Sequence, residues 1–176
     1  MSEKKFMKKV KDFFENAIQE YRRSSSGRRG KSSPMLEVQS DKIYTGSIPW
    51  RKTNTKWEWA NFSRQIDLTI GIKTQVESDE MLIPLLAIEL KSGWAMNSDE
   101  LDKKSAIYGP LRELYPWVHT VFIHEDISER NLGNQYLLRN GRHFSSIYTE
   151  WDARTQGLFK KLIHQQLEYQ LDYWDL

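Results

Sequence analysis

The chain has 176 residues, a length that suits one domain with a core large enough to need no covalent staples. It contains no cysteine, which excludes disulfides and thiolate zinc sites and fits an intracellular compartment. The 26 basic and 24 acidic residues leave a net charge of only +2, which by itself indicates no nucleic-acid partner. No apolar run could span a bilayer and no secretory signal opens the chain, so we expect a cytoplasmic protein.

The first predicted element is an amphipathic helix over residues 3–22, where apolar residues recur at helical spacing and lysines cover the other face. A stretch rich in serine, glycine and basic residues follows, and we expect it to be flexible. It contains no acidic residue and the following basic ones: Arg22, Arg23, Arg28, Arg29 and Lys31. Such a segment is either a solvated connection or a set of phosphate contacts, and the sequence leaves both interpretations open.

The middle of the chain predicts β structure. Residues 66–72 alternate between apolar and polar, which is typical of a strand, and residues 85–91 form a largely apolar run that suits a strand buried on both faces. We expect further extended structure within residues 36–62. If the two strands pair antiparallel about a turn near Ser78, partner numbers sum to about 156, and Asp67 lies opposite Glu89.

A helix is predicted from about residue 97 to Tyr108, with a break or kink at Gly109-Pro110 and a short helical continuation to Tyr115. Residues 118–124 predict another strand, and residues 156–173 predict a final helix. The order of helix, strands, helix, strand and helix indicates an α/β fold.

Asp67, Glu89 and Lys91 form the candidate active site. Glu89 and Lys91 are two apart on a strand, so both side chains leave the same face, and Asp67 would lie about 5 Å away at Cβ. Two carboxylates this close repel unless a cation lies between them, and hard oxygen ligands suit Mg²⁺ or Mn²⁺. The Lys91 ammonium could act on an attacking water or on phosphate charge. An acidic and a basic residue two apart are more often an exposed ion pair, but the apolar surroundings of Glu89 favour a function.

The sequence Ile66-Asp67, a spacer of 21 residues, and Glu89-Leu90-Lys91 resembles the PD-(D/E)xK nuclease superfamily, although Ile66 replaces the proline of the motif. The resemblance implies a restriction-endonuclease-like αβββαβ core over about residues 3–125, with a mixed central sheet flanked by helices. It also implies that Asp67, Glu89 and the Leu90 backbone carbonyl bind the metal and that Lys91 is catalytic. We expect one domain over residues 1–176, with a C-terminal helical extension at about 150–176.

The family often adds an upstream glutamate on the first helix. We slightly favour Glu20 over Glu37 for this role, because Glu20 lies at the edge of the apolar stripe of the first helix. On the helix after the site, Lys103 or Lys104 and Tyr108 could face the metal, as a polar residue and a tyrosine do in related nucleases. We instead expect a surface lysine pair and a packed tyrosine.

The predicted function is that of a Mg²⁺- or Mn²⁺-dependent endonuclease that hydrolyses DNA, of restriction or defence type. The size suits a homodimer in which each active site cuts one strand. RNA stays open as a substrate because the metal site does not read the sugar. The alternative is a catalytically inactive nucleic-acid-binding or structural module on the same fold.

Overall fold

The computed structural model describes residues 2–25, 36–39, 42–52, 56–76, 79–93, 98–126 and 134–173. These residues form four helices and seven strands in the order α1 (Glu3–Ser25), β1 (Leu36–Gln39), β2 (Lys42–Lys52), β3 (Trp57–Gln65), β4 (Leu68–Val76), β5 (Asp79–Lys91), α2 (Ser98–Leu114), β6 (His119–His124), α3 (Asn134–Asn140), β7 (Ser146–Tyr148) and α4 (Ala153–Tyr173). None of the helices in these ranges is long and apolar enough to cross a membrane.

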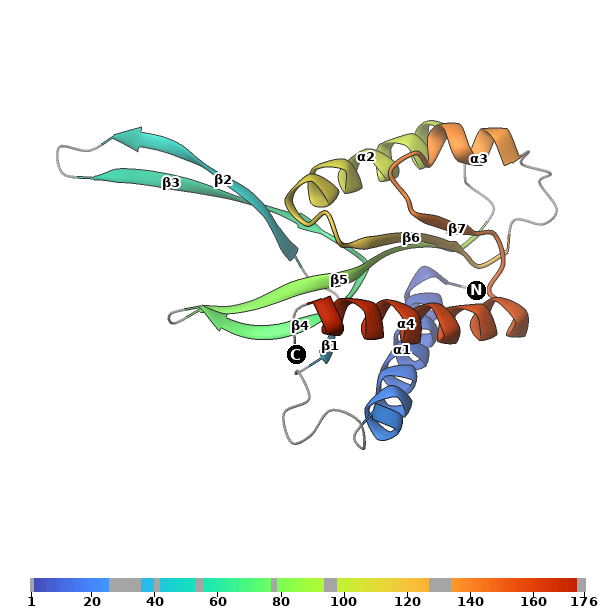
Figure 1. Cartoon of the computed structure of the whole chain (residues 1–176). Helices are drawn as coiled ribbons and strands as arrows, with labels where there is room; N and C mark the ends of the chain where they lie inside the picture. Colours follow the sequence, from blue (N-terminus) through green and yellow to red (C-terminus); the bar gives the residue numbers. More distant parts are fainter. Residues whose placement is uncertain are drawn as a thin grey trace.

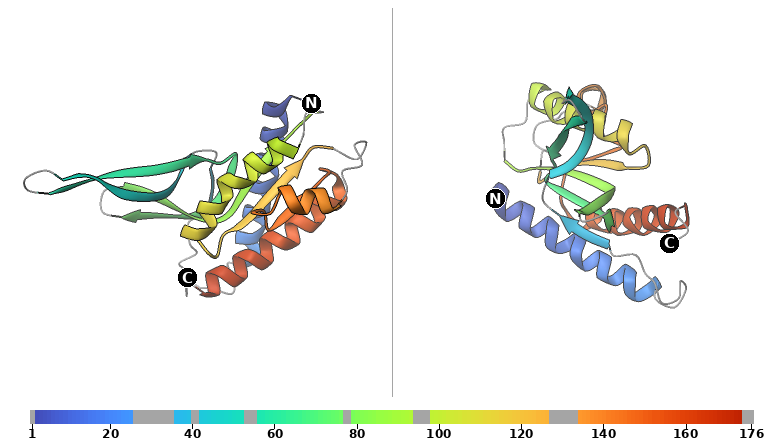
Figure 2. Two further views of the ribbon diagram at one scale, coloured as in Figure 1. Left: turned by 90° about the horizontal axis from the view of Figure 1, so that it is seen from above. Right: turned by 90° about the vertical axis from the view of Figure 1, so that its left-hand side faces the viewer.

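Five of the strands form a mixed sheet in the order β1-β4-β5-β6-β7 (Figure 1). The β1, β4 and β5 strands are antiparallel neighbours, whereas β5, β6 and β7 run parallel. The helices α1 and α4 cover one face of this sheet, and α2 and α3 cover the other (Figure 2). The β2 and β3 strands form a separate antiparallel ribbon inserted between β1 and β4. The remaining order is the predicted αβββαβ core, and the predicted fold class is confirmed.

One core lies between the sheet and the helices α1 and α4. The apolar stripe of α1 is fully buried there, as Phe6, Val10 and Phe14 show, which explains why this lysine-rich segment is a helix. From α4, Phe159 and Ile163 are buried in the same core. The C-terminal helix is therefore packed against the sheet and contributes to its stability.

The pairing of β4 with β5 follows the predicted register next to the site. Leu68 pairs with Ile88 and Ile70 with Leu86, so the partner numbers sum to 156 as predicted. Beyond Ile70 a bulge shifts the register by one residue. The bulge brings Gly71 against the carbonyl of Ile83, where an added Cβ would lie 2.4 Å from the oxygen, so only glycine fits.

Several element limits differ from the predictions. Of the break or kink expected at Gly109-Pro110, the break is wrong, because α2 continues through Pro110 to Leu114. Tyr108 and Leu111, on either side of the proline, are both buried in a second core, which lies between α2 and the sheet. This packing outweighs the backbone hydrogen bond that the proline removes. The short elements α3 and β7 were not predicted, whereas the extended structure expected within residues 36–62 is present as β1, β2 and most of β3.

Candidate active site

Asp67 and Glu89 lie side by side at the end of β5, on the face of the sheet that α2 covers. Asp67 directly precedes β4, and its Oδ2 accepts a 2.8 Å hydrogen bond from the backbone N–H of Leu90. Leu68 pairs with Ile88, so the same register carried one residue further sets Asp67 opposite Glu89. The charges of both carboxylates raise the pKa values of Lys104 and Tyr108 on α2. The predicted juxtaposition is present, and we call Asp67 and Glu89 the acidic pair.

Glu89 is the buried member of the acidic pair, with 2% of its surface exposed. Its Oε2 accepts a 3.0 Å hydrogen bond from the Tyr108 hydroxyl, and its Oε1 contacts the Lys104 ammonium. Both partners come from one face of α2, because they are four residues apart on that helix. The helix α2 therefore holds the carboxylate in place from above the sheet.

The pKa of Glu89 is raised to about 7. Burial is the largest cause, and the negative charge of Asp67 adds to it, whereas Lys104 and Tyr108 lower the pKa in part. The same arrangement acts on Lys104: burial lowers its pKa, but the charges of Glu89 and Asp67 raise it on balance. A carboxyl that titrates near neutrality, next to a second acid, is typical of functional sites.

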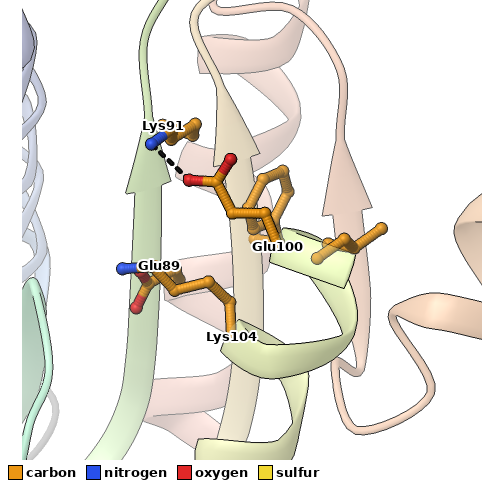
Figure 3. A pocket seen from close by; sticks show the side chains of 6 residues that line it. Glu89, Lys91, Glu100 and Lys104 are labelled. Carbon is orange, nitrogen blue, oxygen red and sulfur yellow. Dashed lines mark ion pairs between the residues drawn. The ribbon is translucent and has the colours of Figure 1, made fainter. Parts of the chain in front are cut away.

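Lys91 lies two residues beyond Glu89, as the strand period requires. Its ammonium forms a 2.5 Å ion pair with Glu100 in the first turn of α2. Figure 3 shows Glu89, Lys91, Glu100 and Lys104 lining one pocket between β5 and α2. Two ion pairs of opposite direction thus connect the strand and the helix, one through Glu89 and one through Lys91.

The expectation that Lys104 is a surface lysine and Tyr108 only a packed tyrosine is wrong. Tyr108 is fully buried, but its hydroxyl is bonded to Glu89, and Lys104 pairs with the same carboxylate. The spacing of four residues between Lys104 and Tyr108 indicated that both lie on one face of the helix. Sequence alone did not show which face of α2 looks toward the sheet.

The preferred upstream glutamate, Glu20, is not at the site. Glu20 is exposed near the end of α1, and its carboxylate accepts hydrogen bonds of 3.0 and 2.8 Å from Lys160 on α4. This ion pair lowers the pKa of Glu20. At Glu20 the edge of the apolar stripe of α1 faces the helix α4 and not the site. This orientation explains why the prediction of Glu20 as a site residue is wrong. The charge of Glu3, at the other end of α1, contributes to raising the pKa of Lys104.

Glu37, the alternative to Glu20, lies on β1 opposite Gly71. Gly71 is four residues along β4 from Asp67, which corresponds to about 13 Å of strand. The Glu37 carboxylate lies 3.9 Å from the Lys73 ammonium. Glu37 therefore belongs to a different part of the sheet from the acidic pair.

Only part of the predicted basic segment is described. Arg22 is exposed near the end of α1 and donates a 2.6 Å hydrogen bond to the carbonyl of Leu36, the first residue of β1. Arg23 is also exposed. Arg28, Arg29 and Lys31 lie outside the described residues.

The acidic pair has the chemistry that a hard divalent cation needs. It offers carboxylate oxygens where burial and the negative charge of Asp67 raise the Glu89 pKa, and a cation would relieve the repulsion between the two acids. The Leu90 N–H points at Asp67, and the carbonyl of a strand residue leaves on the same edge as its N–H, so the Leu90 carbonyl leaves β5 on the edge where Asp67 lies. Within the described ranges, no cluster of three histidine, cysteine or acidic residues could hold a metal, so the carbonyl and water would have to complete the ligand set.

No protein-family model matches the chain, and no curated protein matches it. Among solved structures, the chain is similar to one described as the native BbvCI A2B2 tetramer at low resolution, with a TM-score of 0.43 and 13% identity. The match covers 72% of this chain and 54% of that chain, so this chain spans about half the length of its counterpart. The similarity is too weak to carry an activity, a metal or a partner over to this protein.

Proposed function

We propose that this chain is a divalent-metal-dependent endonuclease that hydrolyses DNA phosphodiester bonds, of restriction or defence type. The observation that carries the proposal is the acidic pair: a nearly inaccessible Glu89 beside Asp67, with Lys91 two residues further along the same strand face. Burying a carboxylate next to a second one is costly, and such groups are found where they have a partner or a task. Asp67, Glu89 and the Leu90 carbonyl would hold Mg²⁺ or Mn²⁺.

A bound cation would supply an activated water and neutralise charge on the phosphate oxygens. The chain's own residues do the rest. Lys91, held on the α2 side of β5 by Glu100, orients the attacking water or stabilises the charge that develops on the phosphate. Tyr108 fixes the Glu89 carboxylate through its hydrogen bond and leaves the other oxygen to Lys104 or to the cation.

The second candidate function is a catalytically inactive nucleic-acid-binding or structural module on the same fold. The two ion pairs favour this second function. Lys104 already neutralises the charge of Glu89, and Glu100 already neutralises the charge of Lys91. A structural ion-pair network between a strand and a helix also perturbs pKa values. Activity and metal binding separate the two candidates.

The test is cleavage of supercoiled plasmid by the purified chain, with Mg²⁺ or Mn²⁺ and with chelator. We expect nicking or linearisation with either metal and none in chelator. Asp67→Asn keeps an acceptor for the Leu90 N–H but removes the charge, so it should lose metal binding in calorimetry together with cleavage. The matched control is Asp12→Asn, an exposed acid on α1, which should retain both. DNA binding by the wild type without cleavage under any of these conditions would favour the inactive module.

A further inference from the structure

The β2–β3 ribbon, residues 42–52 and 57–65, stands apart from the rest of the fold. It is a two-stranded sheet of its own, and both figures of the whole chain show it extending away from the helices and the five-stranded sheet (Figures 1 and 2). The nine residues of β3 correspond to about 30 Å at ~3.3 Å per residue. A two-stranded ribbon is marginally stable in water by itself, so an arm of this length is expected to have a partner.

The root of the ribbon is fixed next to the candidate active site. Ile43, near the start of β2, and Ile66, just after β3, are both buried in the core beneath α2. Asp67 of the acidic pair follows Ile66 directly, so the ribbon and the site share one anchor. A ligand that contacts both the acidic pair and the far part of the ribbon has to be elongated.

The charge of the ribbon identifies the kind of ligand. Residues 42–65 contain five basic residues and one acidic residue, whereas the whole chain has a net charge of only +2. The ribbon segment is therefore strongly basic, as residues 22–31 also are, in a chain whose total charge is nearly balanced. Lys52, Lys56 and Arg64 are exposed on it. An elongated polyanion is the complementary partner.

The backbone of the ribbon suits one groove in particular. The major groove of B-form DNA, about 12 Å wide, admits a two-stranded β-ribbon, whereas the major groove of A-form RNA is too narrow for side chains to read. Two register irregularities, between Tyr44 and Gly46 and between Pro49 and Arg51, interrupt the pairing. Such irregularities bend a ribbon and increase its twist, which a curved groove requires.

We propose that the β2–β3 ribbon is an arm that enters the major groove of a DNA duplex while the same duplex is held at the acidic pair. The inference rests on the proposed function and deepens it, because it makes the substrate double-stranded DNA and assigns its recognition to the ribbon.

The test measures binding of a short fluorescent DNA duplex in chelator, where no cleavage occurs. The combined variant Lys52→Gln, Lys56→Gln and Arg64→Gln should bind about tenfold or more weakly, with its salt dependence reduced by about 0.9 for each lost phosphate contact. The matched control removes three exposed lysines from the helices α1 and α4, Lys8→Gln, Lys9→Gln and Lys161→Gln, and should bind as the wild type does. An unchanged affinity and salt slope in the ribbon variant would overturn the inference.

Two further probes test the groove. The first probe is a DNA duplex that carries glucosylated 5-hydroxymethylcytosine, whose sugars fill the major groove. The second probe is an RNA duplex of the same sequence, whose major groove is narrow. The wild type should bind both more weakly than plain DNA. A shortened ribbon, in which Asn-Gly replaces residues 47–61 between the paired Gly46 and Phe62, should bind plain and glucosylated DNA equally. Equal binding of plain DNA and either modified probe by the wild type would contradict a major-groove arm, as would failure to bind plain DNA.

These outcomes are distinct from those of the proposed function. If duplex DNA binds in a ribbon-dependent way but is not cleaved in Mg²⁺ or Mn²⁺, the proposed nuclease activity is contradicted and the proposed DNA-binding arm is supported. If cleavage is metal-dependent but the ribbon variants bind DNA with wild-type affinity, the proposed nuclease activity is supported and the proposed arm is contradicted.

Discussion

The ammonium of Lys104 contacts Oε1 of Glu89, so a side chain of α2 already occupies one oxygen of the buried carboxylate at the end of β5. A metal ion that binds Glu89 has to compete with this ammonium for the same oxygen. The contact also stabilises the ionised form of Glu89, since Lys104 is the largest of the causes that lower its pKa. The relationship between these two residues therefore governs the cost of burying the acid and, in the proposed function, would also govern metal binding.

Lys104→Met should increase the affinity for Mg²⁺ or Mn²⁺ at pH 8, because it removes the competing charge and keeps most of the length of the side chain. In the absence of metal, the same variant should lose about 1–3 kcal/mol of unfolding free energy at pH 8, where the wild-type Glu89 is ionised and paired with Lys104, and little at pH 5, where Glu89 is protonated in both proteins. Calorimetry and urea unfolding measure the two effects. The control is Lys103→Met, at the exposed neighbouring position. A weaker metal affinity in the Lys104 variant would contradict the competition.

Glu89→Gln should remove a pH dependence of stability. Because the pKa of Glu89 is about 7 in the folded chain against an ordinary value of 4.5, the folded state binds the proton more tightly. This contribution is complete below pH 4.5 and is lost as the pH rises through about 7, a change of roughly 3 kcal/mol for the group. Relative to Glu89→Gln, the wild type should therefore lose stability between pH 5 and 8 in metal-free buffer. Parallel curves for the two proteins would show that Glu89 does not titrate there.

Tyr108→Phe tests the second contact of Glu89. The substitution keeps the buried ring and removes only the 3.0 Å hydrogen bond to Oε2, which lowers the Glu89 pKa in the wild type. The pKa of Glu89 should rise. Because the ionised carboxylate is the form that binds a metal, the pH at which metal affinity increases should be higher than in the wild type. A titration of metal affinity against pH measures this shift. Tyr169→Phe, at a tyrosine that is 70% exposed, should leave the profile in place.

The basic segment after α1 should contribute to DNA affinity more than to chemistry. Neutralising Arg28, Arg29 and Lys31 with glutamine removes three of its charges and should flatten the dependence of DNA binding on salt, by about 0.9 in slope for each lost phosphate contact. Cleavage at saturating DNA should stay at the wild-type rate. A salt slope equal to that of the wild type would mean that this segment is a solvated connection.

The strands that carry the site could be predicted because one physical pattern decided them. The alternation in residues 66–72 and the apolar run at 85–91 indicate two strands, and antiparallel pairing about a turn near Ser78 then gives the register that places Asp67 by Glu89. The helix after β5 was also expected, but not its orientation. Whether Lys104 faces the sheet depends on tertiary packing of Tyr108 and Leu111, which local spacing does not show.

The remaining differences have physical causes of the same kind. Glu20 lies at the edge of an apolar stripe, and such an edge can face either the sheet or a neighbouring helix; here it faces α4 through Lys160. The short strand β7 has only three residues and pairs with β6 in the sheet, so its extended form comes from that partner. The helix α3 has seven residues, a length at which periodicity carries little information.

The most direct measurement of the central claim is plasmid cleavage by Lys91→Ala, with DNA binding and metal binding measured on the same protein. In the proposed function, Lys91 acts on the water or the phosphate, whereas Asp67 and Glu89 would hold the metal. We predict that Lys91→Ala lowers the Mg²⁺-dependent cleavage rate by at least about a hundredfold and retains its affinity for DNA and for Mg²⁺, while Lys103→Ala cleaves as the wild type does. Full cleavage by Lys91→Ala, or cleavage by the wild type in chelator, would contradict this account.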